Sequence, residues 1–266
     1  MPKMSSGEAT PVRSAERMLN ILGWFKLERP RGRISEIAED LGLAPSTVRR
    51  LVTTLEQYRF LEREPASGEY RLHIEVVRLA GIAVSTNDMH QAAAPVLDKL
   101  AKELDETLIL AVLDGPQVVH LAVRLSLHRL SITPPTARRV TAYEGGANGR
   151  VLLAWLPPDE VDALIPPARS WRTQTADHEI TRKHFFELLE TTRTSGHSIN
   201  DGVSDPDLWA VAAPVRDHTG KVQAALSLLA RRSSMTDERA ETFIARVLEG
   251  ADAISRSVLY DKRSAD

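Results

Sequence analysis

Apolar side chains recur at helical spacing in two short stretches between residues 34 and 61. The apolar positions of the first stretch are Ile34, Ile37, Ala38 and Leu41, and those of the second are Val48, Leu51, Val52 and Leu55. Both sets follow the spacing of an amphipathic helix. Gly42 is a helix stop, and Pro45 or Ser46 can begin the next helix because proline's missing N–H costs nothing at the first position. The pattern predicts a helix-turn-helix.

The opposite side of the second helix carries basic and hydroxyl side chains. These are Ser46, Thr47, Arg49, Arg50, Thr53 and Thr54. A short helix with one dry face and one face of arginine and hydroxyl groups fits the major groove of DNA. We therefore expect DNA contacts from Ser46, Thr47, Arg49, Arg50 and Thr53. The alternative is an ordinary helical hairpin whose charged face is solvated.

Two short strand-like runs follow, at residues 60–64 and 69–72, and the turn-forming residues 65–68 join them. A helix-turn-helix followed by a β-hairpin is the order of a winged helix. We expect the wing to lie over the phosphate backbone or the minor groove, with Arg63, Ser67 and Arg71 as its contacts. This order favours DNA binding over simple helix packing.

Residues before this region predict one more helix, capped by Ser14 and ending near Lys26. Its expected inward stripe is Ala15, Met18, Leu19, Leu22 and Phe25. The basic turn at residues 28–33 has two interpretations, a phosphate contact or a solvated loop.

Residues 74–85 form a strongly apolar helical stretch directly after the small domain. A helix of this kind needs a partner surface. It either pairs with its counterpart in a second subunit, as a linker helix, or is buried against its own chain.

A different pattern begins near residue 89 and mixes helices with strands. Expected helices span residues 91–104, 150–156, 183–192 and 236–259, and expected strands span 107–113, 118–123, 125–132, 210–215 and 222–229. The pattern predicts an α+β domain of about 170 residues. Fold class is therefore α+β, with the winged helix-turn-helix at the N-terminal end.

Composition agrees with a globular protein of 266 residues, 42% hydrophobic and 26% charged. The net charge of −2 does not advertise nucleic-acid binding, although residues 1–86 hold 13 basic and 11 acidic side chains against 21 and 25 in the rest. Placement of arginines matters more than the total. No apolar run approaches a membrane span and no signal peptide is visible, so we expect a cytoplasmic protein without a membrane partner.

Catalytic and metal-binding patterns point away from an enzyme. The chain has no cysteine, and its eight histidines form no HExxH or comparable constellation with the carboxylates. We expect no catalytic residues, no metal site and no cofactor.

At this point the chain closely resembles the IclR family of bacterial transcription regulators. The residues that carry the resemblance are the runs 14–22 and 37–43, Ser46-Thr47-Val48 with Arg50-Leu51, 68–72, 147–154, and 212–215 followed by 222–227. The resemblance implies a winged helix-turn-helix at 12–73, a linker and dimerisation helix at 74–88 and a GAF-like effector-binding domain at 89–260, between tails at 1–11 and 261–266. It also implies a homodimer or homotetramer on palindromic double-stranded operator DNA.

The expected effector site lies at the glycine-rich stretch 145–149, before a helix. Backbone N–H groups and the positive end of a helix dipole suit a carboxylate there, which singles out Asn148 and Gly149. The resemblance implies that further residues line the same pocket, namely Asn200, Asp201, Trp209, Ala210, Ser227 and Leu229. Trp209 either forms the floor of this pocket or fills the cavity as a residue of the hydrophobic core. Asn148 departs from the family's usual serine at its position.

The sequence therefore predicts a ligand-responsive transcriptional regulator, with repression of a catabolic operon favoured over activation. Its small-molecule effector is expected to be a small carboxylate or an aromatic metabolite. One alternative is a DNA-binding regulator whose effector domain is filled and senses nothing. The other, less favoured, is an enzyme that acts on a small carboxylate.

Overall fold

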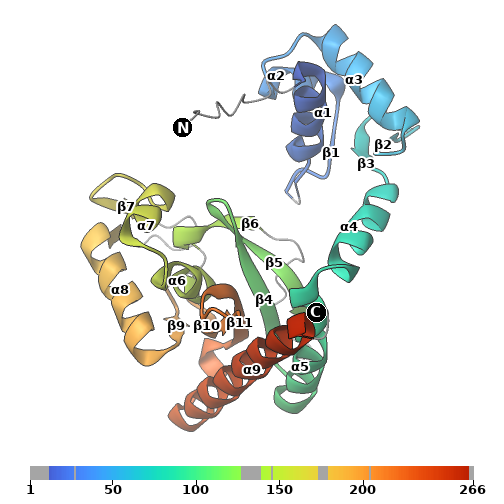
Figure 1. The fold of residues 1–266 in the computed structure, drawn as a ribbon. Coiled ribbons are helices and arrows are strands. Elements are labelled where there is room, and N and C mark those ends of the chain that lie inside the picture. Colours follow the sequence, from blue (N-terminus) through green and yellow to red (C-terminus); the bar gives the residue numbers. More distant parts are fainter. Residues whose placement is uncertain are drawn as a thin grey trace, which may run out of the picture. The chain divides into compact units, whose positions relative to one another are not determined.

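The computed structural model describes residues 12–26, 28–126, 139–144, 146–172, 179–203 and 205–263. The chain divides into two compact units, Met1–Ala83 and Val84–Asp266. Figure 1 colours them along the sequence, from blue helices and a small sheet in the first unit to the large sheet and red helix of the second. Each unit has its own core, so each is described by itself.

The first unit is built from three helices and a small antiparallel sheet. Its elements are α1 (Arg13–Trp24), β1 (Arg31–Gly32), α2 (Ile34–Asp40), α3 (Pro45–Gln57), β2 (Leu61–Arg63) and β3 (Tyr70–Leu72). The strand order is β1-β3-β2. Gly42 takes a φ of +62° and ends α2, and Pro45 occupies the first turn of α3. The predicted helix-turn-helix and wing are both present.

The core of this unit confirms most of the predicted helix faces. The apolar face of α3 is buried through Val48, Leu51, Val52 and Leu55. Leu61 and Tyr70 from the wing strands are buried with them. Because the apolar face of α3 is buried in this core, the opposite, polar side of the helix is left on the outside.

Two expectations for α1 are wrong. The N-cap is Val12 and makes no side-chain cap, so Ser14 lies inside the helix rather than before it. Ala15 and Leu19 belong to the predicted inward stripe but are exposed, Leu19 to 67%, whereas Ile21 and Trp24 are buried. Leu19 and Ile21 are two positions apart, which places them on nearly opposite sides of a helix.

Helix α4 (Glu75–Ser85) has no buried residue. Its apolar side chains Val77, Leu79 and Ile82 are exposed, as is Ile74 before it. The described residues therefore give no support to burial of α4 on its own chain. Pairing with a second subunit stays a prediction.

The second unit is organised on a six-stranded antiparallel sheet. Its strands are β4 (Thr107–Asp114), β5 (Gln117–Arg124), β6 (Arg139–Thr141), β9 (Ser198–Asp201), β10 (Leu208–Arg216) and β11 (Val222–Arg231), in the order β6-β5-β4-β11-β10-β9. Hydrophobic alternation along β10 and β11 sends side chains to both faces, and both are buried.

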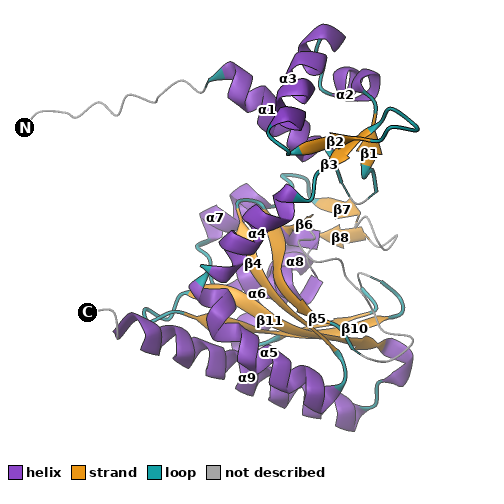
Figure 2. Ribbon diagram, turned by 90° about the vertical axis from the view of Figure 1, so that its right-hand side faces the viewer, coloured by secondary structure: helices purple, strands orange, loops and turns teal. Residues whose placement is uncertain are grey.

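Helices cover the two faces of this sheet. α5 (Asp88–Leu104) and α9 (Asp237–Arg263) pack on one face, as Figure 2 shows below the strands. On the other face α6 (Gly146–Ala154) packs on β9, β10 and β11, and α8 (Arg182–Ser195) packs on α6. The remaining elements of this side are α7 (Pro158–Leu164) and the hairpin of β7 (Ser170–Arg172) and β8 (Glu179–Thr181). This arrangement confirms the α+β class.

We call the buried residues on the α6 side of the sheet, together with α6, the α6 layer. A second core lies between the sheet and α5 and α9. The α6 layer takes Ala210 and Ala212 of β10, while Val211 and Ala213 enter the opposite core. Alternation along one strand therefore decides which core a residue joins.

Several boundaries differ from the sequence prediction. α6 begins at Gly146, so Asn148 and Gly149 lie in its first turn rather than in a loop before it. The predicted strand at 125–132 is not formed at Leu125 and Ser126, and its remaining residues lie outside the described residues. β6, β7, β8, β9 and α7 were not predicted, since all are short and lack a long periodic pattern.

The first prediction concerns Gly149. A Cβ at this position would lie 2.0 Å from the carbonyl oxygen of Ala142, a backbone atom that cannot turn away. Gly149→Ala should lower the free energy of unfolding by about 2 kcal/mol or more, as overpacking does. Urea unfolding followed by circular dichroism measures this. Gly23→Ala is the control, because nothing lies within 4 Å of its Cβ position; equal stability of both variants would contradict the packing argument.

Candidate functional site

The outward face of α3 is a polar surface with two unpaired arginines. Ser46, Arg49, Arg50 and Thr53 are exposed, and Thr47 is half-buried. Neither Arg49 nor Arg50 forms an ion pair with any described residue, so both guanidinium groups remain available. This is the charge distribution that a phosphate backbone or a guanine edge attracts.

The wing carries the remaining predicted DNA contacts. Arg63 at the end of β2 is exposed, and Gly68 closes the turn with a φ of +73°. Arg71 is partly neutralised by Glu62, with 2.7 Å between its Nε and a carboxylate oxygen. The Ser67 hydroxyl accepts a hydrogen bond from the Glu69 N–H at 3.3 Å. Of the wing residues, Arg63 therefore offers the freest positive charge.

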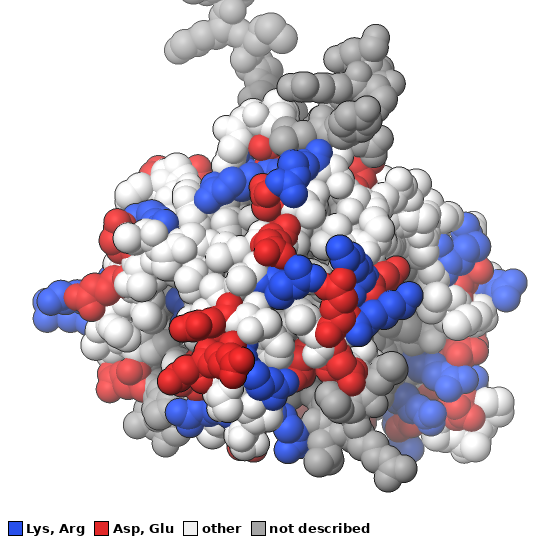
Figure 3. Space-filling view, turned by 90° about the horizontal axis from the view of Figure 1, so that it is seen from below, with Lys and Arg blue, Asp and Glu red and all other residues white. Residues whose placement is uncertain are grey.

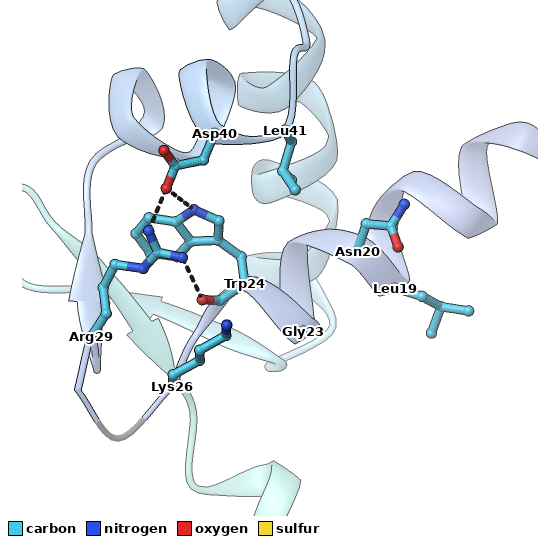
Figure 4. A pocket seen from close by; sticks show the side chains of 8 residues that line it. All are labelled: Leu19, Asn20, Gly23, Trp24, Lys26, Arg29, Asp40 and Leu41. Atoms are coloured by element: carbon cyan, nitrogen blue, oxygen red, sulfur yellow. Dashed lines mark hydrogen bonds and ion pairs between the residues drawn. The ribbon is translucent and has the colours of Figure 1, made fainter. Parts of the chain in front are cut away.

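The basic turn at residues 28–33 has a structural role in this unit. Arg29 stacks on the Trp24 ring at 3.8 Å and pairs with Asp40, which also accepts the Trp24 indole N–H at 2.9 Å. Figure 4 shows these side chains at a surface depression of about 440 Å³ beside α1. Arg33 is the N-cap residue of α2, and its backbone N–H donates a hydrogen bond to the Glu36 carboxylate at 2.7 Å. These contacts favour a fixed structural turn over a free phosphate-binding loop.

The charges of the second unit form a different pattern. On the face shown in Figure 3 acidic and basic side chains are intermingled rather than gathered by sign. An ion pair between Glu103 and Arg246 joins α5 to α9. A second pair joins α9 to the residue before β4, with 2.9 Å between Arg239 and Glu106. Among the described residues no cluster of three His or acidic side chains could hold a metal ion.

Four of the predicted effector residues share the sheet face beneath α6. Asn200 pairs with Ala210 across β9 and β10, and Ala210 pairs with Leu229 on β11. Ser227 pairs with Ala212, two residues further along and on the same face. Directly paired residues point to the same side of a sheet. Asn148 belongs to the first turn of α6, the helix that packs on these strands.

The α6 layer buries polar oxygen atoms that have no hydrogen-bond partner among the described residues. Asn148 is 8% exposed, and Asn200 and Ser227 are 1% exposed. Their Oδ1, Oδ1 and Oγ atoms lie out of solvent contact, and no described residue forms a hydrogen bond with them. The buried indole Nε1 of Trp171 in the same core is likewise unpartnered among the described residues. Native proteins leave few such atoms, so this concentration marks a candidate ligand site.

Arg150 adds a buried positive charge to this layer. Its Nε donates to the Ser198 hydroxyl at 2.8 Å and its Nη2 donates to the Ile199 carbonyl at 2.6 Å. Burial lowers the pKa of the Arg150 guanidinium to about 10, which leaves it charged at neutral pH. No described acidic side chain pairs with it. The prediction from sequence missed Arg150, although it is the one basic residue of the apolar run 147–154.

Two of the predicted effector residues lie elsewhere. Asp201 is exposed and its carboxylate lies 2.6 Å from Nε of Arg232. Trp209 is cross-strand paired with Asp201 and packs against Phe243 of α9, so it belongs to the opposite core. Of its two interpretations, packing as core is the one that the structure shows. Strand alternation explains both corrections, because each is one residue away from a residue that faces α6.

The first unit presents an arginine-bearing recognition helix, and the second buries unsatisfied polar groups beneath a helix N-terminus. Together they define a DNA-binding regulator with an effector domain. Family models match both parts: the IclR helix-turn-helix domain over residues 14–65 and the C-terminal domain of bacterial transcriptional regulator IclR over residues 81–256. The chain therefore belongs to the IclR family of transcriptional regulators.

Individual relatives agree with this assignment. The Transcriptional repressor IclR of Escherichia coli is 27% identical over 96% of this chain and 93% of its own. An IclR transcriptional regulator from Alicyclobacillus acidocaldarius has a similar fold, with a TM-score of 0.83, 24% identity and coverage of 94% and 100%. An IclR homolog from Microbacterium hydrocarbonoxydans, complexed with 4-hydroxybenzoate, gives a TM-score of 0.74 at 24% identity, covering 92% and 98%. The family assignment confirms that the chain is a regulator and not an enzyme. Within the described residues, no helix has the length and apolar character needed to cross a membrane.

The second prediction tests the fixed turn. Asp40→Ala removes the acceptor shared by Trp24 and Arg29 and should cost the first unit about 1 kcal/mol, since the group is half-exposed. Glu39→Ala, its exposed neighbour, should change stability by less than about 0.5 kcal/mol. Urea unfolding gives both values. Equal effects of the two variants would show that the turn is not held by Asp40.

Proposed function

We propose that this regulator contacts operator DNA with Ser46, Thr47, Arg49, Arg50 and Thr53 of α3 in the major groove. Arg63, Ser67 and Arg71 of the wing contact the phosphate backbone or the minor groove. The observation that carries this proposal is that α3 buries four apolar residues and leaves two unpaired arginines outside. A helix so oriented presents charge and hydrogen-bond donors to base edges.

The protein acts as a dimer on an operator with two half-sites, or as a tetramer built from such dimers. The exposed apolar surface of α4 supports this, because Val77 and Leu79 are exposed and the described part of the chain buries no residue of this helix. Paired α4 helices would set the separation of two recognition helices, which half-site spacing fixes. Effector binding would then change DNA affinity through that separation.

The effector is a small carboxylate or an aromatic metabolite bound in the α6 layer. Asn148, Asn200 and Ser227 supply polar contacts, Ala210 and Leu229 supply apolar ones, and the backbone at Gly149 lies in the first turn of α6. The 4-hydroxybenzoate complex of an IclR homolog supports a ligand of this size on this fold. Unpartnered buried oxygens argue against a domain that is filled and senses nothing.

Repression of a catabolic operon is the regulatory outcome that we propose. The relative from Escherichia coli bears the name Transcriptional repressor IclR, and it matches nearly the whole chain. A repressor that releases DNA when it binds a metabolite couples gene expression to that metabolite by simple linkage of two binding equilibria.

The third prediction tests the recognition helix. Arg50→Ala should weaken binding to the DNA upstream of the regulator's own gene by about tenfold to 100-fold, the loss of one base contact. Fluorescence anisotropy at fixed salt measures it. Arg256→Ala on α9, an exposed arginine that pairs with Asp252, is the matched control. Unchanged affinity of Arg50→Ala would remove α3 from the interface.

The fourth prediction tests the dimer. Val77→Asp places a charge on the exposed apolar face of α4 and should raise the dimer dissociation constant by at least about tenfold, because the charge would be desolvated. Analytical ultracentrifugation measures the constant. Tyr58→Asp replaces another exposed apolar side chain and should leave it unchanged. A variant at Val77 that dimerises normally would exclude α4 from the interface.

A further inference from the structure

We propose that the effector of this protein is a small carboxylate that carries several hydroxyl groups along its chain, and not an aromatic acid. This inference rests on the proposed function, since it names the chemical class bound at the same site. It follows from the kinds of polar atoms that the α6 layer leaves without partners and from their placement on the sheet.

The unpartnered oxygens can be satisfied by a ligand that brings hydrogen-bond donors to the two amide oxygens and either a donor or an acceptor to the Ser227 hydroxyl. Asn148 and Asn200 each bury an amide oxygen, and Ser227 buries a hydroxyl, without a partner among the described residues. An amide oxygen only accepts, whereas a ligand hydroxyl can donate to it and accept from another group. A buried polar group without a partner is costly, so a ligand that satisfies it gains affinity over one that does not. A bare aromatic ring would leave these oxygens without partners, and the single hydroxyl of 4-hydroxybenzoate could donate to only one of them.

The oxygens are also spread over the sheet rather than gathered at one point. Asn200 lies on β9 and Ser227 on β11, so two strand spacings, about 10 Å, separate their backbones. Between them lie Ala210 and Ala212 of β10, which carry only methyl side chains on this face of the sheet. One hydroxyl could not reach all of these oxygens. Hydroxyl groups distributed along an extended chain could.

The charge of the layer favours an acid over a neutral polyol. The first turn of α6 presents backbone N–H groups that lack intrahelical acceptors, and the helix has nine residues. Arg150 brings a buried guanidinium into the same layer without a described acidic partner. A ligand with one carboxylate would supply the missing negative charge, while its hydroxyl groups satisfy the asparagine and serine oxygens.

The test measures binding of six probes to the full chain by isothermal titration calorimetry. A set of hydroxylated monocarboxylates, comprising glycerate, gluconate and galactonate, is compared with hexanoate, sorbitol and 4-hydroxybenzoate. At least one hydroxylated acid should bind about 100-fold more tightly than hexanoate, which lacks the hydroxyls, and than sorbitol, which lacks the carboxylate. Equal binding of hexanoate, or failure of every hydroxylated acid to bind, overturns the inference.

Variants show whether the tightest hydroxylated acid uses the predicted oxygens. Asn200→Leu and Ser227→Ala should each weaken its binding at least about tenfold, while Ser257→Ala on the exposed side of α9 should not. Removal of an unpartnered polar group should leave the melting temperature of the ligand-free protein unchanged or raise it. A merely structural role would instead lower it. Lost stability together with unchanged affinity would contradict the assignment.

The aromatic probe separates this inference from the proposed function. If 4-hydroxybenzoate binds tightly, loses affinity in Asn200→Leu and changes the affinity for DNA, the effector site stands and the hydroxylated class is wrong. If neither the acids nor the aromatic probe binds, both are wrong. Binding of a hydroxylated acid with no change in affinity for DNA would support the ligand class and contradict the regulatory switch.

Discussion

Burial of both faces is the constraint that governs the central sheet of the effector domain. A strand whose side chains enter a core on both faces has no solvent-exposed side. Each polar side-chain atom on it therefore needs a hydrogen-bond partner in the protein or in a ligand. The core under α5 and α9 meets this condition with apolar residues, including Trp209. The α6 layer does not, because the part of the chain that the structure describes gives the oxygens of Asn148, Asn200 and Ser227 no partner. One sheet therefore separates a structural face from a face that can hold a ligand.

The DNA-binding domain follows the same physical logic on a smaller scale. The core buries the apolar face of α3, and this burial leaves the arginine face on the outside. The turn before α2 is held by Arg29, Trp24 and Asp40, so the charge of Arg29 has a structural partner within the domain. The exposed arginines of α3, which form no ion pair with any described residue, are therefore the positive charges available for recognition of DNA.

Long periodic patterns made most of the fold predictable. The apolar stripe of α3 and the runs that became β10 and β11 were each visible in the sequence, because burial imposes a period of 3.6 or 2. The errors came from positions where one residue changes the face, as with Trp209 beside Ala210 and Asp201 beside Asn200. Arg150 was missed for another reason. Its hydrogen-bond partners, Ser198 and Ile199, are 48 and 49 residues away, and no local sequence pattern predicts contacts over that separation.

The central claim is that DNA is bound by the first unit through α3 and the wing, while the second unit binds the effector. Hydrogen exchange followed by mass spectrometry on the full chain, with and without its upstream DNA, tests this division most directly. The account predicts that DNA slows exchange most strongly in peptides from Pro45–Gln57, Leu61–Arg63 and Tyr70–Leu72. Protection centred on β9, β10 and α6, with none in α3, would contradict it.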